Sequence, residues 1–123
     1  MAITVLVADD EKRVRELIKD ILEEAQPDVV VIEAKNGSEA QAAFCTPGVS
    51  VEAVITDFDF GHGMTGLELI AWLRQNNPKI PILLFTSHEL SGHADEFLLK
   101  PASIASSRIA FGRLLARLKK PVA

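Results

Sequence analysis

Short apolar runs that alternate with longer amphipathic segments are the feature that most constrains the fold. The first run, Ile3–Ala8, is rich in β-branched residues and ends at an acidic pair. Such a run is typical of a strand that is buried on both faces of a parallel sheet. Segment 14–25 then places apolar side chains at helical spacing, and Pro27 follows it. We therefore predict a helix that packs against this first strand.

The same strand and helix unit recurs along the rest of the chain. Further strands are predicted at 29–34, 51–56, 80–85 and 97–99. Further helices are predicted at 39–45 with Ser38 as N-cap, at 67–75, and in a final segment with Phe111, Leu114, Leu115 and Leu118 on one stripe. Five strands that alternate with helices predict a doubly wound α/β fold, in which a five-stranded parallel sheet carries helices on both faces. A chain of 123 residues is expected to form one domain over residues 1–123.

Composition limits the classes of partner. The formal net charge of −4 argues against direct nucleic-acid binding, which needs a basic face to displace counterions from phosphates. No apolar run is long enough to cross a membrane, and an acidic stretch at 9–11 interrupts the first apolar segment too early for a signal peptide. Cys45 is the single cysteine, and its helix-like surroundings predict a small buried hydrophobe. We expect a cytoplasmic protein that binds neither membranes nor nucleic acid directly.

Polar residues follow four of the five predicted strands at the point where each strand ends. These are Asp9 and Asp10 after the first strand, Asp57 and Asp59 after the third, Thr86 and Ser87 after the fourth, and Lys100 after the fifth. Ligands of doubly wound sheets bind outside the carboxyl ends of the strands, so these side chains are expected to converge on one rim. Gathered carboxylates repel one another unless some take up protons or a cation neutralises them.

These residue types favour phosphoryl transfer. Mg²⁺ prefers oxygen ligands and is commonly bound by one or two carboxylates together with a substrate phosphate, which suits Asp9, Asp10 and Asp57. A carboxylate can act as a nucleophile and form an aspartyl-phosphate. Lys100 would then contact one phosphoryl oxygen, and the Thr86 hydroxyl would donate to another. We therefore predict Mg²⁺-dependent phosphoryl transfer onto Asp57.

The chain resembles the receiver domains of two-component response regulators. Five stretches carry the resemblance, and they occur in the family's order: "VLVADDEKRVREL", "VEAVITD", "GLELI", "PILLFTS" and "LKP". The resemblance covers nearly the whole chain and implies a flavodoxin-like receiver fold. It also implies that the domain is a signalling switch rather than an enzyme, although it promotes its own phosphorylation and dephosphorylation.

The resemblance assigns roles to individual residues. It implies that Asp57 is the phosphoacceptor, that Asp10 binds Mg²⁺ directly with support from Asp9, and that the backbone carbonyl of Asp59 is a further ligand. Thr86 and Lys100 would contact the phosphoryl group, and Phe97 would be the aromatic residue that changes rotamer on phosphorylation. The phosphodonor would be a sensor histidine kinase or a histidine phosphotransfer protein, and the downstream target would be a protein. We expect no output domain within these residues.

Two segments depart from the family pattern. Only "SHELSGHADEFLL" separates Thr86 from Lys100, which is shorter than the family's usual segment, and Gly92 is a poor helix former. We therefore predict that the fourth helix of the fold is reduced to about one turn or missing, which alters a common output face of the family. The loop after Asp57 is one residue longer than expected and has Gly61 where the family usually has proline. His62 in this loop is close enough in sequence to touch a bound phosphate, whereas His88 and His93 are expected to be solvated.

Three alternative functions deserve comparison. The "DFG" at 59–61 is a protein-kinase signature, but the chain is too short for a kinase. A D-x-D phosphatase would use Asp57 as nucleophile and Asp59 as general acid, yet the acid pair of this chain lies upstream and no segment is long enough for a cap. A pseudo-receiver would keep the fold and bind proteins without being phosphorylated. The full set of acids and the lysine favours the phosphorylated receiver.

Overall fold

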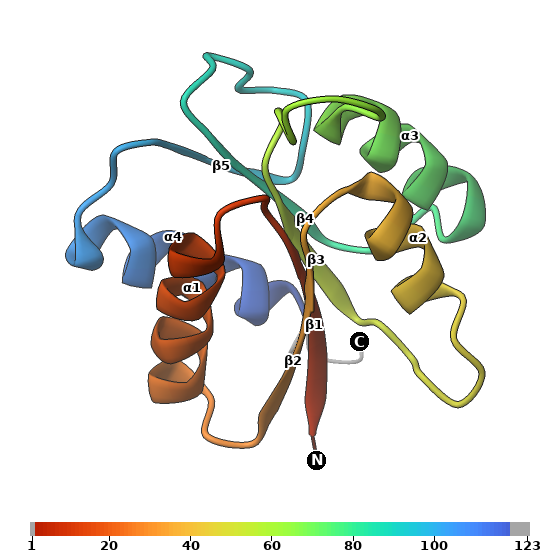
Figure 1. Ribbon diagram of the computed structural model, residues 1–123. Coiled ribbons are helices and arrows are strands. Elements are labelled where there is room, and N and C mark those ends of the chain that lie inside the picture. Colours follow the sequence, from red (N-terminus) through yellow and green to blue (C-terminus); the bar gives the residue numbers. More distant parts are fainter. Residues whose placement is uncertain (1, 119–123) are drawn as a thin grey trace.

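Five parallel strands form the centre of the computed structural model, which describes residues 2–118 (Figure 1). The strands are β1 (Ile3–Ala8), β2 (Val29–Ala34), β3 (Ala53–Thr56), β4 (Ile82–Thr86) and β5 (Glu96–Leu99). The helices are α1 (Lys12–Ala25), α2 (Gly37–Phe44), α3 (Gly66–Asn76) and α4 (Ile104–Leu118). The strands pair in the order β2-β1-β3-β4-β5, and every pair is parallel. The predicted doubly wound fold is confirmed, and the predicted element boundaries agree with these within two residues.

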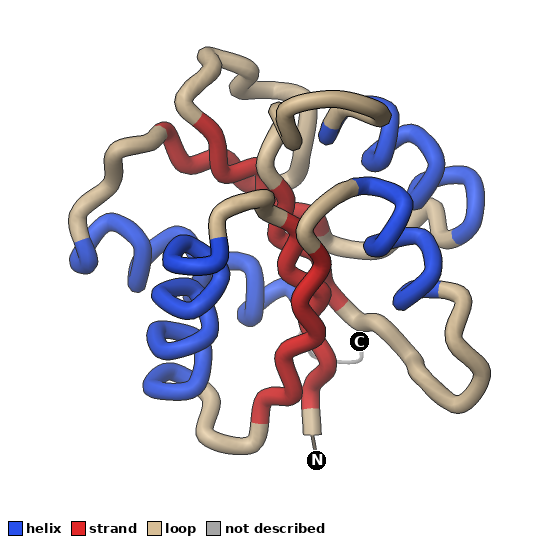
Figure 2. The backbone as a smooth tube through the Cα atoms, in the orientation of Figure 1, coloured by secondary structure: helices blue, strands red, loops and turns tan. Residues whose placement is uncertain are grey.

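Helices cover both faces of the sheet (Figures 1 and 2). Val5 and Val7 of β1 point into the apolar layer under α1 and α4, where they meet buried residues such as Phe111. Leu6 points into the opposite layer under α2 and α3, where it meets buried residues such as Leu69. Alternate side chains of one strand are therefore buried on both sides, which explains why β1 reads as a continuous apolar run. Within the described residues, no helix is both long and apolar enough to span a bilayer.

Two local predictions around α2 are wrong. The N-cap is Asn36 rather than Ser38, because the Asn36 side chain accepts a hydrogen bond from the Glu39 amide at 2.8 Å and the helix begins at Gly37. Cys45 is exposed rather than buried. The helix ends before Cys45 and buries only Gly37 and Ala40, so a residue beyond its last turn lies at the surface.

Residues 87–95, between β4 and β5, form a loop that contains no helix (Figure 2). The prediction of a reduced or missing helix is therefore confirmed. Asp95, at the end of this loop, forms hydrogen bonds with helices on both faces of the sheet. Its carboxylate accepts hydrogen bonds from Arg74 of α3 at 2.5 Å and from the Ile82 amide at 2.8 Å, and its backbone carbonyl accepts one from Arg117 of α4 at 3.0 Å. One aspartate thus ties the edge of the sheet to helices on opposite faces.

The Asp95 carboxyl has a lowered pKa. Partial burial acts to raise this pKa, but the hydrogen bonds from Arg74 and Ile82 and the charges of Arg74 and Arg117 outweigh it. A carboxyl whose pKa is lower in the folded state stabilises the fold above its unfolded pKa of about 3.9, and this stabilisation is lost as the pH falls through the folded pKa.

We expect Asp95→Asn to lower the free energy of unfolding by about 1–2 kcal/mol at pH 7, because a charge-assisted network is broken. The difference from wild type should shrink as the pH falls from about 4 through the lowered pKa of the folded Asp95 carboxyl, which becomes neutral over that range. Urea unfolding at pH 7 and at pH 3 measures both effects. Asp20→Asn, at an exposed position of α1, is the control and should change stability by less than about 0.5 kcal/mol. An Asp95→Asn effect of equal size at both pH values would contradict this role.

Candidate functional site

The carboxyl ends of β1, β3, β4 and β5 meet at one edge of the sheet, where the chain order reverses. From β1 the chain passes to β2 on one side and then to β3 on the other, and ligands of doubly wound folds bind at such a switch point. A cleft of about 240 Å³ lies at this edge. It is lined by Asp10, Glu11, Asp57, Asp59, Gly61, Ser87, His88 and Lys100. The predicted rim therefore exists, and the cleft gathers most of the predicted residues.

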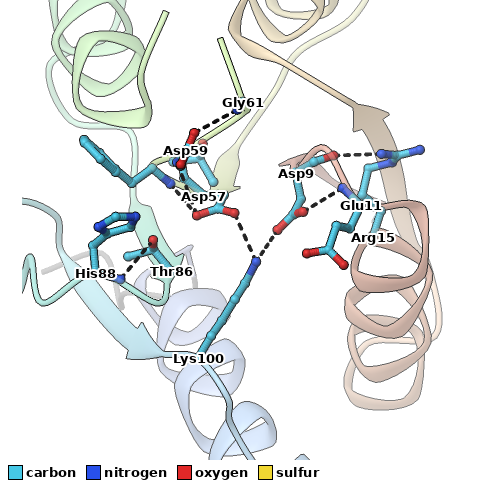
Figure 3. A network of polar contacts seen from close by, with 11 residues as sticks. Asp9, Glu11, Arg15, Asp57, Asp59, Gly61, Thr86, His88 and Lys100 are labelled. Atoms are coloured by element: carbon cyan, nitrogen blue, oxygen red, sulfur yellow. Dashed lines mark hydrogen bonds and ion pairs between the residues drawn. The ribbon is translucent and has the colours of Figure 1, made fainter.

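The Lys100 ammonium lies between two buried carboxylates (Figure 3). Lys100 Nζ is 2.7 Å from Asp9 Oδ2 and 3.1 Å from Asp57 Oδ2. The side chains of Asp9 and Asp57 are only 2% and 10% exposed, and that of Lys100 is 17% exposed. The ammonium also lies 5.2 Å from the centroid of the Phe85 ring. One lysine thus links the ends of β1 and β3 from a position directly after β5.

Burial and charge shift the protonation equilibria of this pair. Burial raises the pKa of Asp9, and the hydrogen bonds from Lys100 and the Glu11 amide reduce this shift without cancelling it. Burial acts to lower the pKa of Lys100, but the contacts with Asp9 and Asp57 outweigh it and the pKa is raised. Lys100 therefore stays charged at neutral pH, while Asp9 carries the cost of a buried charge.

Three carboxylates can share one cation. Oxygen atoms of Asp9, Asp10 and Asp57 all lie within 4.8 Å of one another. Opposite ligands of an octahedral Mg²⁺ lie roughly 4.2 Å apart, so this all-oxygen set fits the ion with little adjustment. When all are ionised, the three carboxylates and the Lys100 ammonium carry a net charge of −2, which one divalent ion neutralises. Within the described chain, the Asp10 carboxylate has no hydrogen-bond or ion-pair partner, so it is free to bind a cation.

Asp57 and Asp59 have different surroundings. Asp57 Oδ1 accepts a hydrogen bond from the Phe58 amide at 2.6 Å, while Oδ2 faces Lys100. The Asp59 carboxylate accepts from the Gly61 amide at 2.8 Å, within its own loop (Figure 3). The Asp59 carboxylate is therefore bound within its own loop, whereas the Asp57 carboxylate is paired with Lys100.

Gly66 closes the loop that begins at Asp57. A Cβ atom at this position would lie 2.0 Å from the Asp57 carbonyl oxygen and 2.7 Å from the Phe58 Cα atom. The Gly66 amide also donates to the Phe58 carbonyl at 2.7 Å. This close backbone approach explains why glycine begins α3 directly after the candidate acceptor.

Thr86 is fully buried at the end of β4, and its hydroxyl accepts a hydrogen bond from the His88 amide at 3.3 Å. Among the described residues, this hydroxyl makes no hydrogen bond with Asp57 or Lys100. Its backbone carbonyl accepts from the Lys100 amide at 2.8 Å, which sets the position of Lys100 beside β4.

His88 is exposed, as predicted from the sequence. It also lines the cleft, a position that the sequence interpretation did not assign to it, and its ring packs edge-on against Phe58 with 4.9 Å between centroids. His62, the histidine expected near a bound phosphate, is exposed and does not line the cleft. The position of His88, two residues after a strand-end threonine at the rim, was the available signal.

The family comparison identifies a known domain. Residues 5–108 match the family model described as "Response regulator receiver domain". The chain is 34% identical over 122 residues to the transcriptional activator protein ExaE of Pseudomonas putida, with 91% of this chain and 55% of that protein covered. The chain spans between 30% and 55% of the length of the curated relatives that it matches.

Solved structures agree with this match. A response regulator receiver domain protein from Clostridium thermocellum superposes with a TM-score of 0.79 at 25% identity, covering 95% of this chain and 97% of that one. The response regulator TrrA of Thermotoga maritima, solved in complex with Mg²⁺-BeF, superposes with a TM-score of 0.77 at 30% identity. The two chains are covered to 91% and 98% in that comparison.

We expect Asp9→Asn to raise the free energy of unfolding by up to about 1 kcal/mol at pH 7 without divalent ions. The substitution removes a buried charge, and Lys100 keeps its ion pair with Asp57. An acid whose folded pKa is raised contributes stability that is present below its unfolded pKa and is lost as the pH rises through the folded pKa. The gain of the variant should therefore grow from about pH 4 upward. Urea unfolding at several pH values, with and without Mg²⁺, measures it.

We expect added Mg²⁺ to stabilise the wild type and Asp9→Asn to lose most of that stabilisation. Asp10→Asn is the matched control, because this carboxylate is exposed. It should leave stability without the ion nearly unchanged and reduce the response to Mg²⁺. Destabilisation of Asp9→Asn at pH 7 without Mg²⁺ would show that the bond to Lys100 outweighs the burial cost.

Proposed function

The chain belongs to the response regulator receiver domain family, and on that premise we propose that it accepts a phosphoryl group on Asp57 in two-component signal transduction. We take residues 1–123 as a single receiver domain. The observation that carries the proposal is the Lys100 ammonium held between Asp9 and Asp57 beside the third carboxylate, Asp10. A candidate nucleophile, a cation for the transferred oxygens and a cation-binding set of acids thus lie together.

In the proposed reaction, an Asp57 carboxylate oxygen attacks the phosphorus of a phosphohistidine in line. The new O–P bond forms as the P–N bond breaks, and the electron pair leaves with the imidazole. Lys100, already 3.1 Å from Asp57, would stabilise the charge on a phosphoryl oxygen. The Thr86 hydroxyl would turn from the His88 amide to donate to another oxygen. In hydrolysis, a water oxygen would attack the phosphorus in line, the P–O bond to Asp57 would break, and the products would be inorganic phosphate and the Asp57 carboxylate.

We propose Mg²⁺ as the cofactor, held by Asp9, Asp10, Asp57 and the backbone carbonyl of Asp59. The spacing of the three carboxylates supports this proposal, and so does the Mg²⁺-BeF complex of the related TrrA. When bound, the ion would supply positive charge that offsets the acids and the transferred phosphoryl oxygens. Without such charge, a phosphoryl group would have to approach a cluster that already repels anions.

The proposed donor is a sensor histidine kinase or a histidine phosphotransfer protein, and the proposed output is a change in protein contacts. Phe97 of β5, partly buried against the layer under α2 and α3, would change rotamer when Thr86 moves. The proposed setting is the cytoplasm, and the proposed role is that of a switch rather than an enzyme.

We expect incubation with acetyl phosphate and Mg²⁺ to form one acyl phosphate per chain. Intact mass spectrometry should then show a mass increase of about 80 Da. Asp57→Asn should show no adduct, because the nucleophile is lost. A chelator should abolish most of the adduct, because the acids are then left uncompensated. Lys100→Met should reduce the rate by roughly a hundredfold or more, as for loss of one electrostatic contact in a transition state.

Samples quenched at short times guard against rapid hydrolysis, and beryllofluoride offers a stable mimic of the phosphoryl group. If neither a covalent adduct nor a Mg²⁺-dependent change with beryllofluoride is found, the chain is a pseudo-receiver that binds partners without phosphorylation. An adduct that persists in Asp57→Asn would mean that a different side chain is the acceptor.

A further inference from the structure

Arg15 of α1 contacts the peptide that joins the two N-terminal acids. Its Nη1 atom donates to the Asp9 backbone carbonyl at 2.7 Å (Figure 3). Its Nε atom donates to Glu33 of β2 at 3.0 Å. The Arg15 side chain is only 14% exposed, so these contacts are made in a partly dry environment. A rigid fork of donors therefore links α1, β2 and the turn after β1.

The Asp9–Asp10 turn needs such a link. The Asp9 side chain is held by Lys100 and by the Glu11 amide. The Asp10 side chain has no hydrogen-bond or ion-pair partner among residues 2–118, so the backbone of the turn is what restricts where its carboxylate can lie. The carbonyl that Arg15 holds belongs to the peptide between these two residues. Fixing that peptide limits where the Asp10 carboxylate can point.

We propose that Arg15, anchored by Glu33, is a positioning residue that orients the Asp9–Asp10 turn for divalent-cation binding. This inference rests on the proposed Mg²⁺ site. Groups that orient metal ligands affect affinity without touching the metal, and their loss typically weakens binding by 10–100-fold. Arg15 acts in this way through the backbone carbonyl, and Glu33 fixes the guanidinium that makes the contact.

The positive charge of Arg15 acts on Mg²⁺ affinity in the direction opposite to the proposed positioning role. A guanidinium near a cation site repels the cation, so removing a positive charge without any positioning role should tighten Mg²⁺ binding. A positioning role predicts weaker binding instead. A purely structural role predicts lower stability with unchanged affinity. The direction of the change in Mg²⁺ affinity therefore separates the three roles.

Isothermal titration of the full chain with MgCl₂, without phosphodonor, tests the proposal. We expect Arg15→Met to weaken Mg²⁺ binding about tenfold or more. Arg15→Lys should recover part of the affinity, because one ammonium can still donate to the Asp9 carbonyl but cannot hold Glu33 with the same fork. Glu33→Gln should weaken binding less than Arg15→Met, because the contact with Asp9 remains.

Arg13→Met is the matched control, since Arg13 is exposed on the same helix and its loss removes the same charge. It should leave Mg²⁺ affinity unchanged or slightly tighter. Arg15→Met binding that equals or exceeds that of Arg13→Met would overturn the proposal. If Arg15→Met does not fold, unchanged affinity in both Arg15→Lys and Glu33→Gln would overturn it. A wild-type chain that binds no Mg²⁺ would instead refute the proposed metal site, and this inference with it.

Discussion

The contact of one ammonium with two buried carboxylates sets the geometry of the whole rim. Lys100 follows β5, yet its Nζ atom reaches acids at the ends of β1 and β3, so β4 lies between the lysine's own strand and the strand of Asp57. This reach is possible because all strands run parallel and end at the same edge. Removing Lys100 would leave two buried carboxylates without a counter-charge, which is far costlier than losing an exposed ion pair.

The rim is also where the fold can accommodate charge. Both faces of the sheet are sealed by apolar layers, so polar chemistry can only lie at the strand ends. There, burial raises the pKa of Asp9 even with Lys100 in contact, so ionising this carboxylate is costly when no cation is bound. The apolar layers offset this cost, and a cation would relieve it. A local conflict of this kind, supported by a consistent fold, is expected of a functional site.

Much of this arrangement could be predicted from sequence because strand ends coincide with abrupt changes from apolar to polar residues. The change after Ala8 located Asp9 and Asp10, and the change after Thr56 located Asp57. What escaped prediction depends on distant packing. Asp95 meets Arg74 and Arg117, which lie more than twenty residues away on different helices, so no local pattern reveals the network. Arg15 reads as one charge on a polar helix face until β2 brings Glu33 beside it.

The loop at 87–95 is held at both of its ends. Its end is fixed by Asp95, while its start is tied to the site through the His88 amide on the Thr86 hydroxyl and the His88 ring on Phe58. Because residues 87–95 form no helix, this loop connects the buried Thr86 hydroxyl to the protein surface. If Thr86 turns toward a phosphoryl group, the His88 amide loses its acceptor while Asp95 stays fixed. The part of the loop nearest the cleft would then change together with Phe97 on β5, so a partner could read both.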